Sequence, residues 1–205
     1  MTPSILRAVF LTATVAVASL AAAAGAGVGD PAPGFTLADH AGNQVSLSDF
    51  EGKVVVLEWL NPDCPFVVRH YKEGTMKSLE AAYDDKGVVW LTVNSTNYMD
   101  AGANAAFAEK EGVAWKILVD QDGTVGHDYG AQTTPHMYIV DAKGRIVYAG
   151  AIDDDPRGGK PASERTNYVA QALDEVLAGK AVSTPETKPY GCSVKYKKEA
   201  MGIGF

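Results

Sequence analysis

The residue best suited to covalent chemistry is Cys64, in the segment WLNPDCPFVVRHY that spans residues 59–71. An apolar, strand-like run precedes it, and the pattern predicts that a helix begins directly after it. Pro65 suits the first helical turn, because its missing N–H would have no partner at that position. A thiol at the start of a helix faces unpaired backbone N–H groups and the positive end of the helix dipole, which both favour the thiolate. Cys64 is therefore a candidate nucleophile toward disulfides or peroxides, and the alternative is a buried, inert cysteine.

The residues around Cys64 are expected to shift its pKa in opposite directions. Arg69 and His70 follow about one helical turn later and could add positive charge. The neighbouring apolar residues oppose them, because desolvation raises the pKa of a thiol. Since cysteines at helix starts have pKa values of ~3.5–7.5, we expect the pKa of Cys64 to lie below the free value of ~8.5.

A carboxylate, Glu58, interrupts the apolar run KVVVLEWL of residues 53–60. A carboxylate inside a central strand is costly unless it is paired, and it could accept the proton of a nearby thiol. The pattern favours instead an outward-facing residue at the end of the strand. Glu58 is kept as a candidate supporting residue.

A second signal is the segment AQTTPHMYIVD of residues 131–141. Pro135 cannot donate to a strand ladder, so it must lie at the first residue of the strand or in a special turn. A cis Thr134–Pro135 bond costs only ~0.5–1 kcal/mol and would turn Thr134 toward the loop that carries Cys64, although trans is the commoner state.

Alternating strand and helix patterns surround these residues and predict a central sheet with helices on both faces. In such sheets, sites lie at the carboxyl ends of the strands, where Cys64 is expected. Strands are predicted at residues 34–39, 43–50, 53–60, 88–95, 115–120, 136–141 and 146–152. Helices are predicted at residues 65–83, at 101–112 and at 162–180, the last with Ser163 as its N-cap.

The first residues indicate export. Arg7 is followed by an apolar run and by small residues, which is typical of a cleaved signal peptide over residues 1–26. A thioredoxin-like domain over residues 27–180 and a tail over residues 181–205 would follow, in a periplasmic or secreted, oxidising compartment. The chain has 18 basic and 25 acidic residues, so its net charge of −7 argues against a nucleic-acid partner, and no second apolar segment suggests a membrane span.

The chain resembles the redoxin group of the thioredoxin-fold superfamily, which includes peroxiredoxins and thioredoxin-like oxidoreductases. The segments VGDPAPGFTLADHAGNQVSLSDFEGKVVVLEW, NPDCPFVVRHY, TTPHMYIVDAKGRIVYAGAIDD and ETKPYGCSVKYK carry the resemblance, which covers residues 29–198. It implies a thioredoxin-like α/β fold with a central mixed β-sheet and helices on both faces. It also implies that Pro135 is cis and lies beside the reactive sulfur of Cys64.

Two departures from the peroxiredoxin pattern bear on the activity. Asn61 occupies the position of the threonine that activates peroxide, and Pro135 occupies that of the activating arginine. An asparagine amide could still donate to a peroxide oxygen, but we expect slow turnover of peroxide. The C-x-x-C motif of thioredoxin-like members is also incomplete here. The residues three before and three after Cys64 are Asn61 and Val67, so neither supplies a second thiol.

Cys192 is the other cysteine of the chain, in the polar tail segment KPYGCSVKY. This segment could fold back over the active-site end, so we expect the Cα atoms of Cys64 and Cys192 to lie ~4.4–6.8 Å apart. The bond could be catalytic. It could equally be structural, since closing a loop of about 130 residues stabilises the fold by ~4–5 kcal/mol in the chain-entropy model.

The leading interpretation is an exported, peroxiredoxin-like thiol oxidoreductase in which Cys64 attacks and Cys192 resolves. Asn61, Pro65, Thr134, Pro135, Glu58 and Arg69 are the supporting residues. Its partners would be a peroxide or a protein disulfide or thiol, and a thiol electron donor, with no cofactor. The alternatives are a non-catalytic binding module with a structural Cys64–Cys192 bond, and a copper carrier in which His136 joins the sulfur. The run Asp153–Asp155 is interpreted as a solvated turn.

Overall fold

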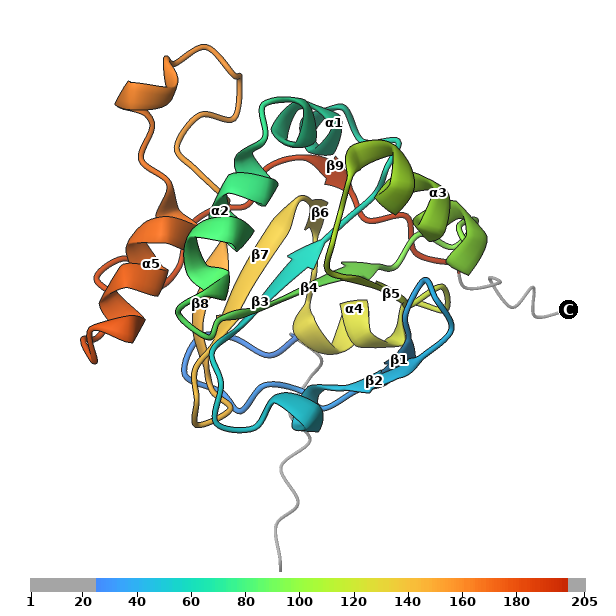
Figure 1. Cartoon of the computed structure of the whole chain (residues 1–205), viewed down its shortest axis with the longest axis horizontal. Coiled ribbons are helices and arrows are strands. Elements are labelled where there is room, and N and C mark those ends of the chain that lie inside the picture. The colour runs from blue at the N-terminus through green and yellow to red at the C-terminus, as the bar shows by residue number, and fades with distance from the viewer. Residues whose placement is uncertain (1–24, 199–205) are drawn as a thin grey trace, which may run out of the picture.

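A computed structural model describes residues 25–198 of the protein, and the predicted signal peptide lies almost wholly outside this range. A five-stranded mixed sheet forms the centre, in the order β5-β4-β3-β7-β8 (Figure 1). Strands β3, β4 and β5 are parallel, whereas β7 is antiparallel to both β3 and β8. The strands are β3 (Val55–Trp59), β4 (Val89–Asn94), β5 (Lys116–Val119), β7 (His136–Val140) and β8 (Ile146–Gly150).

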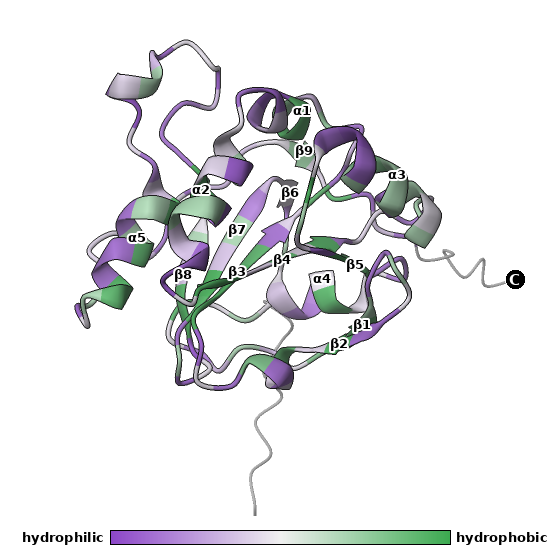
Figure 2. Cartoon of the chain, viewed as in Figure 1, coloured by the Kyte–Doolittle hydropathy of each residue, from purple (hydrophilic) through white to green (hydrophobic). Residues whose placement is uncertain are grey.

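The middle strand, β3, is buried along its whole length, as a continuous apolar run predicts for a strand covered on both faces. Its side chains alternate between two hydrophobic clusters. Val56 belongs to the cluster on one face, and Leu57 and Trp59 belong to the cluster on the other. Figure 2 shows the apolar residues gathered along the central strands.

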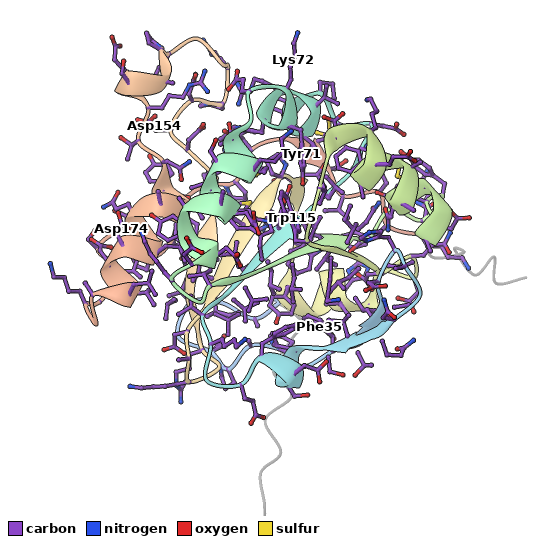
Figure 3. The ribbon with its side chains drawn as sticks, viewed as in Figure 1. Phe35, Tyr71, Lys72, Trp115, Asp154 and Asp174 are labelled. Carbon is purple, nitrogen blue, oxygen red and sulfur yellow. The ribbon has the colours of Figure 1, made fainter. Side chains whose placement is uncertain are left out.

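Four helices cover the first face of the sheet, and one helix and a hairpin cover the second (Figure 1). On the first face Tyr71 and Trp115 point into the packed interior, while Lys72 extends outward (Figure 3). This is the fold class predicted from the sequence. The first face carries α1 (Pro65–Lys72), α2 (Thr75–Asp84), α3 (Ala101–Glu111) and α5 (Tyr168–Leu177). The second carries α4 (Thr124–Tyr129) and the hairpin of β1 (Thr36–Ala38) and β2 (Gln44–Ser46).

The predicted bounds of two helices were wrong. The helix expected over residues 65–83 is broken at Gly74, which has φ +74°, a left-handed conformation that glycine adopts at little cost. The last helix begins at Tyr168, because the Asn167 side chain, and not Ser163, accepts the hydrogen bond of an N-cap. Ser163 lies in a short 3-10 turn, η2 (Ala162–Glu164). A second 3-10 turn, η1 (Leu47–Phe50), replaces the end of the strand expected over residues 43–50.

Helix α4 has no counterpart in the sequence prediction. It spans six residues between two glycines in left-handed conformations, Gly123 and Gly130. So short a segment gives little helical periodicity.

The tail returns across the carboxyl edge of the sheet after α5. Its strand β9 (Cys192–Ser193) pairs with β6 (Thr133–Thr134), just before β7. Further along, Tyr196 stacks on His127 and donates its hydroxyl to the carbonyl of Ala131. The tail thus lies at the edge where the sequence predicts the site.

Candidate active site

Cys64 lies at the N-cap of α1, after a loop of a few residues that follows β3. Pro65 takes the first helical position, as expected. Asn61 shapes the loop, since its side-chain oxygen accepts from the Asp63 N–H at 2.8 Å and its carbonyl accepts from the Cys64 N–H at 3.0 Å. The Cys64 side chain is only 1% exposed, so the tail and the loops cover the sulfur.

Thr134 lies against this sulfur from the other side of the site. The Thr134–Pro135 bond is cis, which confirms the prediction. The Cys64 thiol donates to the Thr134 carbonyl at 2.9 Å. The buried Thr134 hydroxyl has no other hydrogen-bond partner among the described residues and helps to stabilise the sulfur.

Cys192 reaches the same place from the tail. It is the partner of Thr134 in the β6–β9 ladder, and both its side chain and its backbone N–H lie within hydrogen-bonding reach of the Cys64 sulfur. Both cysteines are free thiols in this structure. The tail thus brings Cys192 to the residue that Cys64 also contacts, as the composition of the tail suggested, and the expected Cα–Cα distance stays a prediction.

A glycine permits this close approach. Gly191 has φ +144°, and a Cβ atom on it would lie 2.1 Å from the carbonyl oxygen of Thr134. A side chain at this position would therefore push the tail away from β6. The sequence analysis did not predict this role of Gly191. Its position directly before Cys192 was the one available signal.

The two thiols have pKa values displaced in opposite directions. Burial raises the pKa of Cys64, but hydrogen bonds from the Cys192 side chain, the Thr134 side chain and backbone N–H groups outweigh it and hold the pKa below its ordinary value. Burial, and the proton that Cys192 shares with Cys64, raise the pKa of Cys192 to about 11. Of the two thiols, Cys64 therefore ionises at the lower pH, and Cys192 keeps its proton at neutral pH.

Arg69 and His70 do not add the charge that the sequence suggested. Arg69 donates to the Asp155 carbonyl at 3.0 Å and to the Tyr190 hydroxyl at 3.3 Å, within a separate polar cluster. Burial lowers the pKa of His70 to about 4, so this imidazole is neutral at pH 7. The lowered pKa of Cys64 comes from hydrogen bonds at the sulfur itself.

Glu58 is not the outward-facing residue that the pattern favoured. Its side chain is 0% exposed and accepts hydrogen bonds from the Tyr71 hydroxyl, the Trp90 indole N–H at 3.0 Å and the Thr92 hydroxyl at 3.1 Å. Burial raises its pKa to about 7. These partners belong to the packed face under α1, so the carboxylate is held within the core and not at the sulfur.

His136 opens β7 beside Pro135 and is also buried. Its Nδ1 accepts from the Gln132 N–H at 3.2 Å, and burial lowers its pKa to about 4. Within residues 25–198 no group of three or more His, Cys, Asp or Glu side chains is placed to hold a metal ion.

The run of aspartates after β8 is not the solvated turn that its composition suggested. Asp153 and Asp155 are both buried. Asp155 accepts from two backbone N–H groups of its own loop and forms an ion pair with Arg165 at 3.0 Å. Asp153 accepts the hydroxyl proton of Tyr190.

Comparison with known proteins places the chain in one group. A family model described as Redoxin matches residues 27–170. The thiol-disulfide oxidoreductase ResA of Geobacillus thermodenitrificans is 31% identical over 58% of this chain and 66% of its own length. The thioredoxin-like protein YneN of Bacillus subtilis is 32% identical over 58% of this chain and 68% of its own. The match thus spans about two thirds of each of these relatives.

A solved structure, that of an uncharacterized conserved protein from Geobacillus kaustophilus, resembles more of the chain. It superposes with a TM-score of 0.76 at 33% identity, and the alignment covers 84% of this chain and 94% of the other. This alignment covers more of the chain than the segments that match ResA and YneN.

Proposed function

The chain belongs to the Redoxin family, and on that premise we propose that it is an exported thiol-disulfide oxidoreductase whose redox-active pair is Cys64 and Cys192. The observation that carries the proposal is the contact between these two thiols, which the fold brings together from the start of α1 and from the tail. Their opposite pKa displacements give them different roles. The lowered pKa of Cys64 makes it the nucleophile. Cys192, whose pKa is raised, is the thiol that completes the exchange.

The exchange takes two steps. The Cys64 thiolate attacks one sulfur of a substrate disulfide, the substrate S–S bond breaks, and one substrate thiolate leaves. Cys192 then gives up its proton and attacks the Cys64 sulfur of the mixed disulfide, which releases the second substrate thiolate. The protein ends as the Cys64–Cys192 disulfide, and the substrate has gained two electrons. A thiol electron donor returns the protein to the dithiol by the same chemistry.

The proton of Cys192 is controlled by the state of Cys64. While Cys64 is a thiolate, its charge and its hydrogen bond help to keep the proton on Cys192. A mixed disulfide carries no charge on Cys64, so this restraint ends as the first step is completed. Cys192 then ionises more readily, at the moment when its attack is needed.

Peroxide reduction is the second reaction open to this thiol. The Cys64 thiolate would take one oxygen from the peroxide and become a sulfenate, and Cys192 would condense with it and release water. The side-chain oxygen and the carbonyl of Asn61 accept hydrogen bonds from Asp63 and Cys64 and so hold the loop in shape. In a peroxiredoxin the side chain at this position would instead orient the peroxide. We therefore place disulfide exchange first.

The burial of Cys64 favours a second candidate function, a binding module in which the same bond is structural. The reduction potential of the pair distinguishes the two. The protein is equilibrated in glutathione buffers, free thiols are blocked, and the disulfide fraction is measured by mass. A working pair is expected above about −300 mV, and a structural one below it.

Export is supported by the residues that precede the described range. Arg7, the apolar run after it and the small residues up to about residue 26 have the order of a signal peptide. None of the helices within residues 25–198 has the length and apolar character needed to cross a bilayer. Amino-terminal sequencing of the protein recovered from its native host tests this: a start near residue 26 supports export, and an intact Met1 opposes it.

A further inference from the structure

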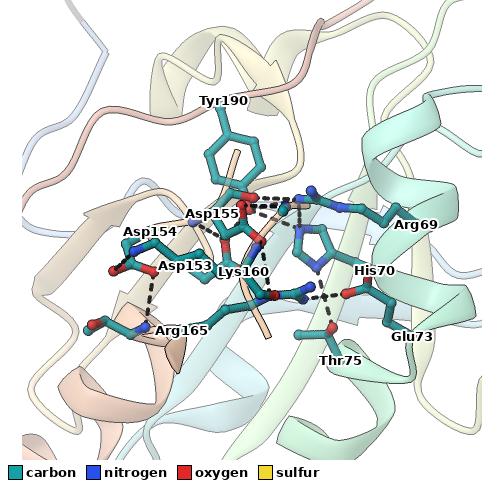
Figure 4. Close-up of polar contacts among 12 residues, drawn as sticks. Arg69, His70, Glu73, Thr75, Asp153, Asp154, Asp155, Lys160, Arg165 and Tyr190 are labelled. Atoms are coloured by element: carbon teal, nitrogen blue, oxygen red, sulfur yellow. Dashed lines mark hydrogen bonds and ion pairs between the residues drawn. The ribbon is translucent and has the colours of Figure 1, made fainter. Parts of the chain in front are cut away.

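Tyr190 lies in the tail two residues before Cys192 and belongs to a partly buried polar cluster (Figure 4). Its hydroxyl donates to the Asp153 carboxylate and accepts from the Arg69 guanidinium at 3.3 Å. The same oxygen lies 3.0 Å from Nε2 of His70. The Arg69 guanidinium also lies 3.2 Å from the same Nε2, so Arg69, His70 and Tyr190 meet at one point.

The cluster is anchored on both sides of the tail. Arg69 and His70 belong to α1, the helix that begins at Cys64. Asp153 belongs to the segment after β8, which Arg165 ties to α1's C-cap through an ion pair with Glu73. Tyr190 therefore joins the segment that carries Cys192 to the helix that carries Cys64.

Other contacts of the tail hold it to different elements. Thr187 bonds to the backbone of Ala149 and Ala151, at the end of β8. Val194 donates to the carbonyl of Gln132, and Tyr196 to that of Ala131, on the segment that leads into β6. Within the described tail, the hydrogen bonds that reach α1 beyond its N-cap, Cys64, are those of Tyr190.

The ring of Tyr190 adds an apolar contact at the same place. Its centroid lies 5.9 Å from that of Phe66, which follows Cys64 by two residues. The guanidinium of Arg69 lies 5.8 Å from the ring centroid. The ring and the hydroxyl thus hold separate parts of α1, one near its start and one a turn later.

We propose that Tyr190 is a positioning residue for the thiol pair, fixing Cys192 at the start of α1 so that the two sulfurs are held ready to bond. This inference rests on the proposed function, because it concerns the reaction between Cys64 and Cys192. The β6–β9 ladder sets Cys192 against Thr134, and Tyr190 sets it against α1. Two fixed directions leave the sulfur less freedom than one, and restricted freedom raises the rate and the equilibrium constant of an intramolecular bond.

The test compares Tyr190→Phe with the wild-type protein. The phenylalanine keeps the ring contact with Phe66 but removes the hydrogen bonds to Asp153, Arg69 and His70. Tyr83→Phe is the matched control, because the Tyr83 hydroxyl also bonds to a carboxylate and a carbonyl, those of Asp174 and Ala170, between α2 and α5. Each variant loses a hydrogen-bonded hydroxyl, and only the first loses one that links the tail to α1.

Two quantities are measured for each protein: the equilibrium constant of the Cys64–Cys192 disulfide with glutathione, and the rate at which the disulfide closes from the glutathione mixed disulfide. Tyr190→Phe is expected to lower both by about tenfold, which for a two-electron couple is a reduction potential higher by about 30 mV. Tyr83→Phe is expected to lower the melting temperature while leaving both quantities unchanged. Tyr190→Ala, which also loses the ring contact, is expected to lower both further.

The outcomes separate the inference from the function beneath it. If Tyr190→Phe lowers only the melting temperature, Tyr190 has a structural role and the inference is overturned. An equal change in both quantities for Tyr83→Phe overturns it as well. If the wild-type pair forms no exchangeable disulfide with glutathione, the proposed function itself fails. Should Tyr190→Ala not fold, the phenylalanine variant decides.

Discussion

Thr134 and Cys192 face each other across a two-residue antiparallel ladder, and the Thr134 carbonyl also accepts a hydrogen bond from the Cys64 thiol. One residue therefore contacts both halves of the thiol pair. Any change that moves the tail away from Thr134 also separates Cys192 from Cys64.

Gly191→Ala is expected to open this ladder. The new Cβ would lie 2.1 Å from the Thr134 carbonyl oxygen, and φ is +144°, so the tail must shift. Closure of the Cys64–Cys192 disulfide from a glutathione mixed disulfide should slow by at least tenfold. Gly144→Ala is the control, because Gly144 has φ +75° and no atom lies within 4 Å of its Cβ position. Equal closure rates for the two variants would contradict the expectation.

The side chain at position 192 should set the acidity of Cys64. Cys192→Ser replaces the thiol with a hydroxyl that can also donate to the Cys64 sulfur. Cys192→Ala removes this donor, while burial still raises the pKa of Cys64. The pKa of Cys64 is therefore expected to be higher in the alanine variant than in the serine variant. The ultraviolet absorbance of the thiolate, followed against pH, measures both. Identical titration curves would show that the thiolate depends on other donors.

Glu58 should make the protein less stable as the pH rises from about 4 to about 7. Its folded pKa of about 7 lies above the value of ~4.3 in an unfolded chain, so the native state binds the extra proton between these values. Stability gained from the neutral carboxyl is full below pH ~4 and is lost by pH ~7, by on the order of 3 kcal/mol.

Glu58→Gln removes this titration, so the free energy of unfolding of the wild type minus that of the variant should fall between pH 5 and pH 8. Urea unfolding at several pH values measures the difference. The surface variant Glu51→Gln serves as the control, since Glu51 is exposed. A difference that stays flat with pH for Glu58→Gln would mean that the carboxyl keeps one protonation state throughout.

Hydrogen peroxide should oxidise Cys64 slowly compared with exchange with a disulfide at equal concentration. Asn61, the counterpart of the activating threonine, uses its side-chain oxygen to accept from the Asp63 N–H. Mass analysis of the Cys192→Ser variant after mixing with either oxidant gives the two rates. Faster oxidation by peroxide would reverse the order of the two reactions proposed above.

Much of the site was predictable because its parts are local or carry strong sequence signals. The apolar run of β3, the proline after Cys64 and the proline before β7 each constrain the backbone within a few residues. Together they placed Cys64 at the carboxyl end of a central strand. The expected meeting with Cys192 followed from the composition of the tail and from there being only two cysteines in the chain.

The rest depended on contacts between residues far apart in the chain. Whether Glu58 faces solvent or core is decided by partners from α1 and β4, which strand periodicity does not reveal. Tyr190 and Asp153 gave no signal because their hydrogen bond joins the tail to a loop that composition marked as solvated. The same long-range contact turned Arg69 away from the thiol.

The position of the tail also has a mechanical consequence. A bond between Cys64 and Cys192 would close about 130 residues into a covalent ring that holds everything from α1 to the last strand. Tension applied between the two ends of the folded chain would then pass along residues up to 64, across the sulfur bridge and out through the residues after 192. The segment between the two cysteines, which contains the strands from β4 to β8, could not be extended by that pull. In the dithiol the same pull would act on the short β6–β9 ladder and peel the tail from the sheet, so the redox state sets which part of the domain yields to force.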